Sequence, residues 1–223
     1  NGEPLNGLER TASEGDVDGL VAMEIDRLKH AKPKPAGWDF LWFLGRSEIY
    51  SDLSTDNKRG IQCKTHKNVC ILQKDAPFAL TPDTRLQWAW CMDELPSDFP
   101  EYTLPTHDYM SIAVEFDNGQ DLTYYWSHSV PVETCYRCPL PTWNSRETHL
   151  VVRSGHDGLG QWIDESRNVY EDCRKAYGEA PKRIVRVWLI ANSLLQRKHG
   201  KCEYRDIRLT NGDAVLDVSL AAS

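Results

Sequence analysis

Apolar and polar residues alternate most regularly in three consecutive segments between residues 82 and 128. A period of two is typical of half-buried β-strands, because successive side chains of a strand point to opposite faces. The residues that share one face are, segment by segment, Leu86, Trp88, Trp90 and Met92; Met110, Ile112, Val114 and Phe116; and Leu122, Tyr124 and Trp126. An Asp-Asn-Gly-Gln sequence at 117–120 predicts a hairpin turn between the second and third segments. We therefore expect the middle of an antiparallel sheet, with one face on a core and the other carrying groups suited to a ligand.

The rest of the chain extends this β pattern. Short strands are expected over 47–74, a central strand buried on both faces over 184–191, and a C-terminal hairpin with Asn211-Gly212 as a type I′ turn. Two isolated helices are predicted, one from Ser13 to the Lys-Pro repeat at 32–35 and one over 165–177.

This set of elements favours an all-β fold with peripheral helices, in the form of an antiparallel β-sandwich of the jelly-roll type. A partly closed barrel is the alternative. The alternation and the apolar run near the C-terminus predict five residues to be buried: Trp88, Ile112, Val114, Val187 and Leu189.

The length of 223 residues fits one large β domain with additions. We assign 1–46 to an N-terminal helical and aromatic extension and 47–223 to the sandwich, as a single globular unit. The extension ends in an aromatic cluster that caps the core or lines a cleft, and core packing is the favoured interpretation. The cluster contains Trp38, Phe40, Trp42 and Phe43.

Composition narrows the classes of partner. A formal charge of −7 and a pI near 5.5 argue against nucleic-acid binding and against attraction to an anionic membrane. No apolar run approaches the roughly 18 residues of a membrane span. Seven irregularly spaced cysteines favour reduced thiols and a cytoplasmic location, while a periplasmic or secreted location stays open because the chain begins at Asn1. The sequence does not indicate the oligomeric state.

Cys135 and Cys138, which have His128 and His149 nearby in sequence, are candidates for a zinc site. A second close cysteine pair is missing, and the remaining spacing matches no standard zinc finger or ribbon. We therefore predict no metal ligands and no cofactor. A structural calcium ion stays open, because jelly rolls can hold one with backbone and carboxylate oxygens.

Candidate site residues gather at the ends of the predicted strands. A His or Asp there can move a proton, and Tyr and Arg can stabilise a developing oxyanion. The catalytic candidates are His107, Asp108, Tyr124 and His128. The substrate-binding candidates are Trp88, Trp90, Tyr125, Trp126, Arg153 and Asp206. Proline-rich loops over 93–107 and 129–147 are expected to form the rim of this cleft.

A structural interpretation exists for the same residues. Asp108 can cap a turn, Asp206 can pair with Arg186 or Arg208, and the tyrosines can pack in the core. For function, two hypotheses stand: a metal-independent acid–base enzyme (lyase, isomerase or cyclase) acting on a small oxygenated substrate, or a non-catalytic carbohydrate-binding module. The helix and the two long loops favour the enzyme slightly.

Several short sequences in this chain also occur, in the same order, in a pattern that resembles a bacterial family of uncharacterised proteins. They are Trp88-Ala-Trp90, His107-Asp108-Tyr109 before 112–116, Tyr124-Tyr125-Trp126, then 151–155, 161–162, 167–178 and 202–207. In this order they resemble the domain-of-unknown-function family three-zero-four-seven over residues 47–210, and the resemblance implies a jelly-roll-like β-sandwich.

The chain departs from the family pattern at two places. The family tends to have paired aspartates where this chain has His107-Asp108, and an Asp/Asn-rich segment where this chain reads Ala-Asn-Ser-Leu at 191–194. A cation-binding role of those family carboxylates is therefore not carried over to this chain. The Tyr-x-Asp-Ile sequence at 204–207 also resembles the last strand of carbohydrate-binding jelly rolls, which bears on fold more than on function.

Overall fold

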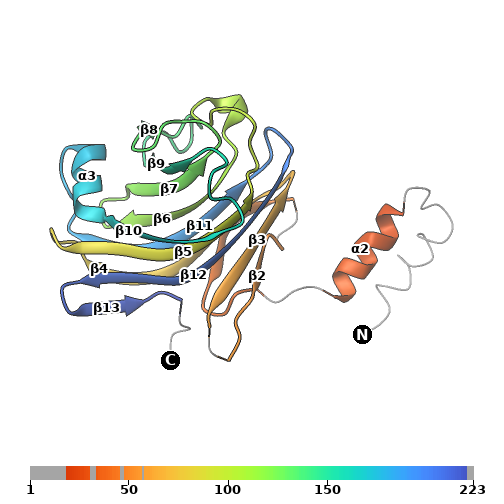
Figure 1. Ribbon diagram of the computed structural model, residues 1–223, viewed down its shortest axis with the longest axis horizontal. Helices are drawn as coiled ribbons and strands as arrows, with labels where there is room; N and C mark the ends of the chain where they lie inside the picture. The colour runs from red at the N-terminus through yellow and green to blue at the C-terminus, as the bar shows by residue number, and fades with distance from the viewer. Residues whose placement is uncertain (1–18, 31–33, 46–47, 57, 220–223) are drawn as a thin grey trace. The chain divides into compact units, whose positions relative to one another are not determined.

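The computed structural model describes residues 19–30, 34–45, 48–56 and 58–219 (Figure 1). The chain divides into two compact units, Asn1–Pro33 and Lys34–Ser223. The described part of the first unit is helix α2 (Leu20–Lys29). It confirms the later part of the predicted N-terminal helix, whose predicted beginning at Ser13 lies outside the described residues.

The second unit is a sandwich of two β-sheets (Figure 1). The seven-stranded sheet has the strand order β1 (Asp39–Leu44), β4 (Val69–Ala79), β11 (Arg183–Asn192), β6 (Tyr109–Phe116), β7 (Asp121–Ser127), β9 (Glu147–Ser154) and β8 (Cys135–Arg137). The six-stranded sheet has the order β10 (Trp162–Asn168), β5 (Thr84–Glu94), β12 (His199–Asn211), β3 (Gly60–His66) and β2 (Tyr50–Asp52), with β13 (Ala214–Asp217) also paired to β12. The predicted β-sandwich of the jelly-roll type is confirmed.

One strand pair runs parallel, where the sequence predicted antiparallel pairing throughout: β7 pairs with β9. Parallel neighbours need a long connection, because the chain must return to the end of the sheet from which it started. Residues 128–146 supply that connection, and β8 within it pairs antiparallel with β9 at the sheet edge. This return places a long segment beside the seven-stranded sheet.

The main core lies between the two sheets, and the alternation in the sequence places the correct residues in it. The inward residues include Trp88 and Trp90 from β5, Ile112 and Val114 from β6, and Tyr124 from β7. All five residues predicted to be buried are less than 3% exposed. The central strand predicted over 184–191 is β11, which lies between β4 and β6.

Two local predictions are wrong in part. Residues 165–168 belong to β10, which pairs with β5, and helix α3 (Val169–Tyr177) begins only where the Asn168 side chain accepts a hydrogen bond from the Glu171 N–H at 3.0 Å. The C-terminal hairpin forms, but Asn211 pairs with Ala214, so the turn residues are Gly212 and Asp213. Of these two only Gly212 has a positive φ, whereas a type I′ turn needs it at both positions.

Strand β1 belongs to the seven-stranded sheet, where it pairs with β4. Of the aromatic cluster around it, Trp38 is buried, whereas Phe40, Trp42 and Phe43 are exposed. Core packing therefore holds for Trp38 alone. No helix among the described residues has the length and apolar character of a membrane span.

Candidate functional site

The outer face of the seven-stranded sheet, opposite the main core, carries a second buried cluster. It consists of Ile71, Tyr109, Ala113, Tyr125, Val130, Val151, Trp188 and Ile190, with Tyr136 and Trp143 packed against it. Tyr125 points to this face because its neighbour Tyr124 points to the core. The aromatic and hydroxyl face expected from the sequence therefore exists. Side chains of the connection at 128–146 pack on it instead of leaving it open.

A pocket of about 150 Å³ lies on this face. Its wall combines the aromatic rings of Trp42, Tyr109 and Trp143 with the Glu147 carboxylate and the Asn192 side chain. The Tyr109 hydroxyl donates a hydrogen bond to Oε1 of Glu147 at 3.2 Å. Trp143 packs edge-to-face on Trp188, with ring centroids 6.2 Å apart. The pocket is therefore mostly apolar, with a carboxylate and an amide in fixed positions.

Next to the pocket, four potential metal ligands meet in the buried layer: His107, Cys138, Glu147 and His149. Their nearest ligand atoms all lie within 4.8 Å of one another. Sγ of Cys138 lies 3.4 Å from Nε2 of His107, and Nε2 of His149 lies 2.6 Å from Oε1 of Glu147. Because Glu147 also lines the pocket, this cluster and the pocket share a side chain.

Burial controls the charges in this layer. It lowers the pKa of His107 well below the usual value, an effect that the nearby His149 strengthens. It also raises the pKa of the Cys138 thiol, with a further contribution from Glu147. The pKa of Tyr109 is raised by burial and by the same carboxylate. Burial therefore favours the neutral forms of His107 and Cys138.

His107 and Asp108, the leading catalytic candidates, are both completely buried. His107 belongs to the metal-ligand cluster. Both carboxylate oxygens of Asp108 accept backbone N–H bonds, from Leu195 at 3.1 Å and from Gln196 at 2.5 Å. Burial raises the pKa of Asp108 to about 6, although these N–H groups oppose the shift. Asp108 therefore caps the turn at Leu195 and Gln196, as the structural interpretation of the sequence predicted.

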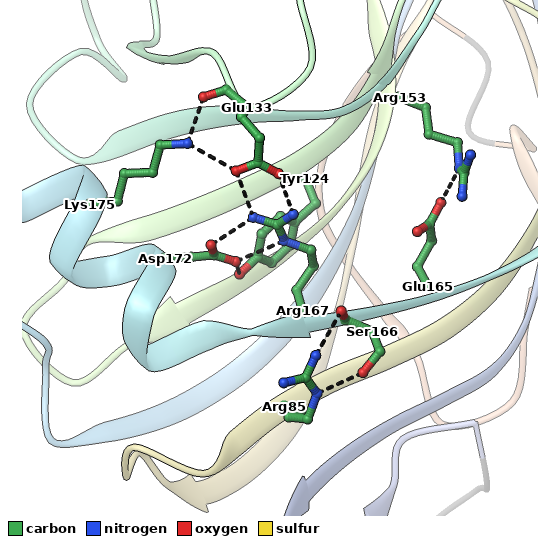
Figure 2. Close-up of polar contacts among 9 residues, drawn as sticks. All are labelled: Arg85, Tyr124, Glu133, Arg153, Glu165, Ser166, Arg167, Asp172 and Lys175. Carbon is green, nitrogen blue, oxygen red and sulfur yellow. Dashed lines mark hydrogen bonds and ion pairs between the residues drawn. The ribbon is translucent and has the colours of Figure 1, made fainter.

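Tyr124 points into the main core, on the opposite side of the sheet from His107. Figure 2 shows its place in a polar network that joins α3 and β10 to the 128–146 connection. Its hydroxyl donates to Oδ2 of Asp172 at 2.9 Å, and Arg167 pairs with Asp172 at 2.7 Å and with Glu133 at 2.6 Å. Lys175 adds a contact of 2.9 Å to Glu133. The network gives Tyr124 a structural role.

The predicted binding residues divide between faces. Trp88, Trp90 and Trp126 belong to the main core, and Tyr125 belongs to the outer cluster, where its hydroxyl lies 2.7 Å from that of Tyr136. Arg153 forms an ion pair with Glu165 (Figure 2), and Glu165 also accepts the Trp90 indole N–H at 3.2 Å. His128 lies at the end of β7 and donates its backbone N–H to Glu101 at 2.7 Å. These residues do not meet in one cleft.

Asp206 lies on the six-stranded sheet, at a bulge of β12 where its φ is 55°. It lines an open hollow of about 330 Å³ together with Trp88, Asp164 and Arg208. The pairing with Arg186 that was considered for Asp206 does not form, since Arg186 pairs with Asp75 and Glu115. The hollow is separate from the outer-face pocket, and apart from Trp88 its lining residues are polar or charged.

Apart from Trp42, the residues that line the outer-face pocket were not among the candidates from the sequence, and the metal-ligand cluster was only partly among them. Glu147 and His149 are two positions apart on β9, so they share a face, and this spacing is a readable signal. Trp143 and Cys138 come from the irregular 128–146 connection, where no periodicity indicates a direction. Trp42 belongs to the aromatic cluster for which the sequence left two alternatives, packing on the core or lining a cleft. Its place in the pocket wall fits the second alternative.

Solved jelly-roll structures align with most of this chain. The xyloglucanase domain of NopAA, a type three effector from Sinorhizobium fredii in complex with cellobiose, is 9% identical, with a TM-score of 0.43, and covers 80% of this chain and 89% of its own. A family 12 xyloglucanase from Bacillus licheniformis is 7% identical, with a TM-score of 0.44 over 80% and 95%. A family 11 carbohydrate-binding module from Clostridium thermocellum is 9% identical, with a TM-score of 0.38 over 82% and 97%. No curated protein matches the chain in sequence.

A family model does match the sequence, over residues 36–208. The match begins before β1 and ends within β12, so it includes the pocket and the metal-ligand cluster. It confirms the resemblance seen in the order of short sequences. The chain therefore belongs to the family described as "Protein of unknown function (DUF3047)".

Proposed function

We propose that this protein is a carbohydrate-binding β-sandwich that holds a sugar ring in its outer-face pocket. The observation that carries the proposal is the combination in one pocket of three aromatic rings with a carboxylate and an amide. A sugar ring has apolar C–H faces that pack on aromatic rings, and hydroxyl groups that bond to carboxylate and amide groups. The volume of about 150 Å³ suits roughly one ring, with any further rings outside the pocket.

Trp143 and Trp42 are the proposed platforms for the ring. Trp143 is half-buried and held by Trp188, so one part of it is fixed while another part lines the pocket. Trp42 comes from the edge strand β1 and is 42% exposed. A pre-positioned aromatic ring loses little conformational entropy on binding, which favours affinity.

Glu147 is the proposed hydrogen-bonding residue. It is buried, and the Tyr109 hydroxyl holds its Oε1, so its direction is fixed before a ligand arrives. Of the described residues that line the pocket, it is the one carboxylate. Hydrolysis of a glycosidic bond ordinarily uses two carboxyl groups on either side of the bond. This supports binding over glycoside hydrolysis, and the predicted lyase, isomerase or cyclase activity stays an untested prediction.

The test uses the full chain and a panel of immobilised glycans, followed by calorimetric titration of the glycans that bind. Trp143→Ala should weaken binding at least about tenfold, because a stacked aromatic ring contributes on the order of 1 kcal/mol beyond its buried area. Trp162→Ala is the matched control, since Trp162 is also a partly exposed indole but lies on β10 of the other sheet. Its binding should equal that of the unmodified protein.

Three results would overturn the proposal: no glycan binds, Trp143→Ala binds as well as the unmodified protein while its melting temperature is unchanged, or Trp162→Ala is the weaker binder. Product analysis of each bound glycan distinguishes the enzyme hypothesis from the binding-module hypothesis. Turnover that is lost in Glu147→Gln while the melting temperature and glycan affinity are unchanged would show that the pocket is catalytic.

A further inference from the structure

We propose that His107, Cys138, Glu147 and His149 form a binding site for one transition-metal ion, with Zn²⁺ as the favoured ion. The four side chains come from three places in the chain: just before β6, the residue just after β8, and two alternate positions of β9. All four are buried, and their ligand atoms converge within 4.8 Å. The metal site and the proposed sugar pocket share Glu147, but the metal site is tested without any glycan, so either proposal can fail alone.

One pair of ligand atoms already has a suitable separation. Sγ of Cys138 and Nε2 of His107 are 3.4 Å apart. Zinc bonds of about 2.3 Å to sulfur and about 2.0 Å to nitrogen, at a tetrahedral angle, separate the two ligand atoms by about 3.5 Å. The 2.6 Å contact between Nε2 of His149 and Oε1 of Glu147 is shorter than the value of about 3.4 Å that the same reasoning gives. The ion would need a small outward shift of these two side chains.

The surrounding hydrogen bonds direct two of the ligands toward the centre. Nδ1 of His107 lies 2.7 Å from the carbonyl oxygen of Glu101, which can only accept, so Nδ1 carries the proton. The lone pair of Nε2 therefore faces Cys138. The Tyr109 hydroxyl donates to Glu147. A metal-bound histidine ordinarily donates its other N–H to a carbonyl or carboxylate, and a metal-bound carboxylate is ordinarily hydrogen-bonded as well.

His149 supplies an independent observation. It is completely buried, and neither ring nitrogen has a hydrogen bond within the described part of the chain. Its Nε2 is close to Glu147 but lies outside hydrogen-bond geometry. A buried polar atom that makes no hydrogen bond is destabilising. A cation at the centre would satisfy this nitrogen directly.

The donor set selects the class of ion. A thiolate with two imidazoles favours zinc and related transition metals, whereas calcium and magnesium prefer oxygen ligands. When Zn²⁺ binds, Cys138 releases its thiol proton to the solvent, and its charge together with that of Glu147 balances the dication. With two neutral imidazoles the site has no net charge, which suits a buried position. Four buried protein ligands are typical of a structural zinc site rather than a catalytic one.

This proposal differs from the metal-free prediction made from the sequence, which stays untested. From the sequence, the candidate ligands are Cys135, Cys138, His128 and His149, and their spacing matches no standard zinc finger or ribbon. The fold selects only Cys138 and His149 from that set, and it adds His107 and Glu147. Neither Cys135 nor His128 belongs to the cluster. An ion here would tie the 128–146 connection to the sheet beside the sugar pocket.

The test is cobalt titration of the full chain, purified with chelator and then dialysed free of it. Bound Co²⁺ in a tetrahedral site with one thiolate gives intense d–d bands and a sulfur-to-cobalt charge-transfer band. We expect saturation at one equivalent of Co²⁺, loss of both signals when Zn²⁺ is added, and one zinc per chain by elemental analysis. X-ray absorption at the zinc edge should then fit one sulfur and three nitrogen or oxygen ligands.

Matched variants separate this site from an adventitious one. Cys138→Ser should abolish the charge-transfer band, and Cys135→Ser, three residues away and outside the cluster, should keep it. If Cys138→Ser does not fold, the ligand count from X-ray absorption of the unmodified protein decides. The proposal is overturned if the unmodified protein binds no Co²⁺ or Zn²⁺, if Cys138→Ser binds as before, or if two sulfur ligands are found.

Discussion

Replacing Asp108 separates its observed structural role from the catalytic role predicted from the sequence. Its two carboxylate oxygens accept the backbone N–H groups of Leu195 and Gln196, at 3.1 and 2.5 Å. These bonds tie the turn after β11 to the start of β6. If this is the function of Asp108, its loss should lower the free energy of unfolding.

The magnitude follows from the number of bonds lost. A hydrogen bond to a charged group contributes about 1.5–3 kcal/mol, so two such bonds set an upper range of about 3–6 kcal/mol. Leu195 is 37% exposed, so water can reach part of the turn and replace some of this energy. We therefore expect Asp108→Ala to cost about 2–4 kcal/mol. Asp108→Asn keeps one acceptor oxygen and should cost about half as much.

Urea unfolding at pH 7 in zinc-saturated buffer measures both variants, and the slope with denaturant should stay constant. Asp206→Asn is the control, because Asp206 is an exposed aspartate on the other sheet and asparagine tolerates its positive φ. Its stability should change by no more than about 0.5 kcal/mol. Unchanged stability in Asp108→Ala would refute the capping account, and loss of a measured turnover at unchanged stability would favour the catalytic role.

Three further predictions concern the network in Figure 2 and the packing between sheets. Tyr124→Phe removes a buried hydrogen-bond donor to Asp172 and should lower the free energy of unfolding in urea by about 1–2 kcal/mol without changing glycan affinity. An unchanged free energy of unfolding would contradict the structural role of Tyr124. Hydrogen bonds from Arg167 lower the pKa of Glu133 to about 2, so its folded-state pKa lies below the unfolded value and its stabilisation is present at neutral pH. That contribution should disappear as the pH falls from about 4.5 toward 2, and it should amount to at most about 1 kcal/mol because the Glu133 side chain is half exposed. The free energy of unfolding of Glu133→Gln should therefore fall less steeply over this pH range than that of the unmodified protein. Equal slopes for the two proteins would contradict this role of Glu133. Gly200→Ala should cost about 1–3 kcal/mol in the same assay, because the added methyl would lie 2.9–3.1 Å from three neighbouring side chains, and an unchanged midpoint would refute this packing.

The period-two alternation correctly predicted the strands and their inward faces. Alternate residues of a strand share one face, and the apolar face of β6 and β11 is the one that packs in the main core. This face includes Ile112, Val114, Val187 and Leu189. The β6–β7 hairpin followed from its Asp-Asn-Gly-Gln turn. The sequence predicts helix at 165–168 because a short segment with mixed periodicity satisfies both patterns, and only the pairing with β5 decides between them.

The candidate site was harder to predict, because it depends on contacts between distant segments. Alternation indicated that Tyr125 turns away from the core, but not that the 128–146 connection would pack over it. The same connection brings Cys138 to within 3.4 Å of His107, across a separation of 31 residues. No local pattern in an irregular segment encodes such a meeting. Spacing along the sequence alone therefore could not bring His107 and Glu147 together with Cys138 and His149.

The central claim is that a sugar ring binds beside Trp143 on the outer face of the seven-stranded sheet. The most direct test is the indole N–H spectrum of the ¹⁵N-labelled protein, in which each of the eight tryptophans gives one signal, assigned by single Trp→Phe variants. On titration with a glycan that binds, we predict that the signals of Trp42 and Trp143 shift in a saturable way while that of Trp162 stays in place. A shift of the Trp162 signal with Trp42 and Trp143 unmoved would place the ligand on the other sheet and contradict the account.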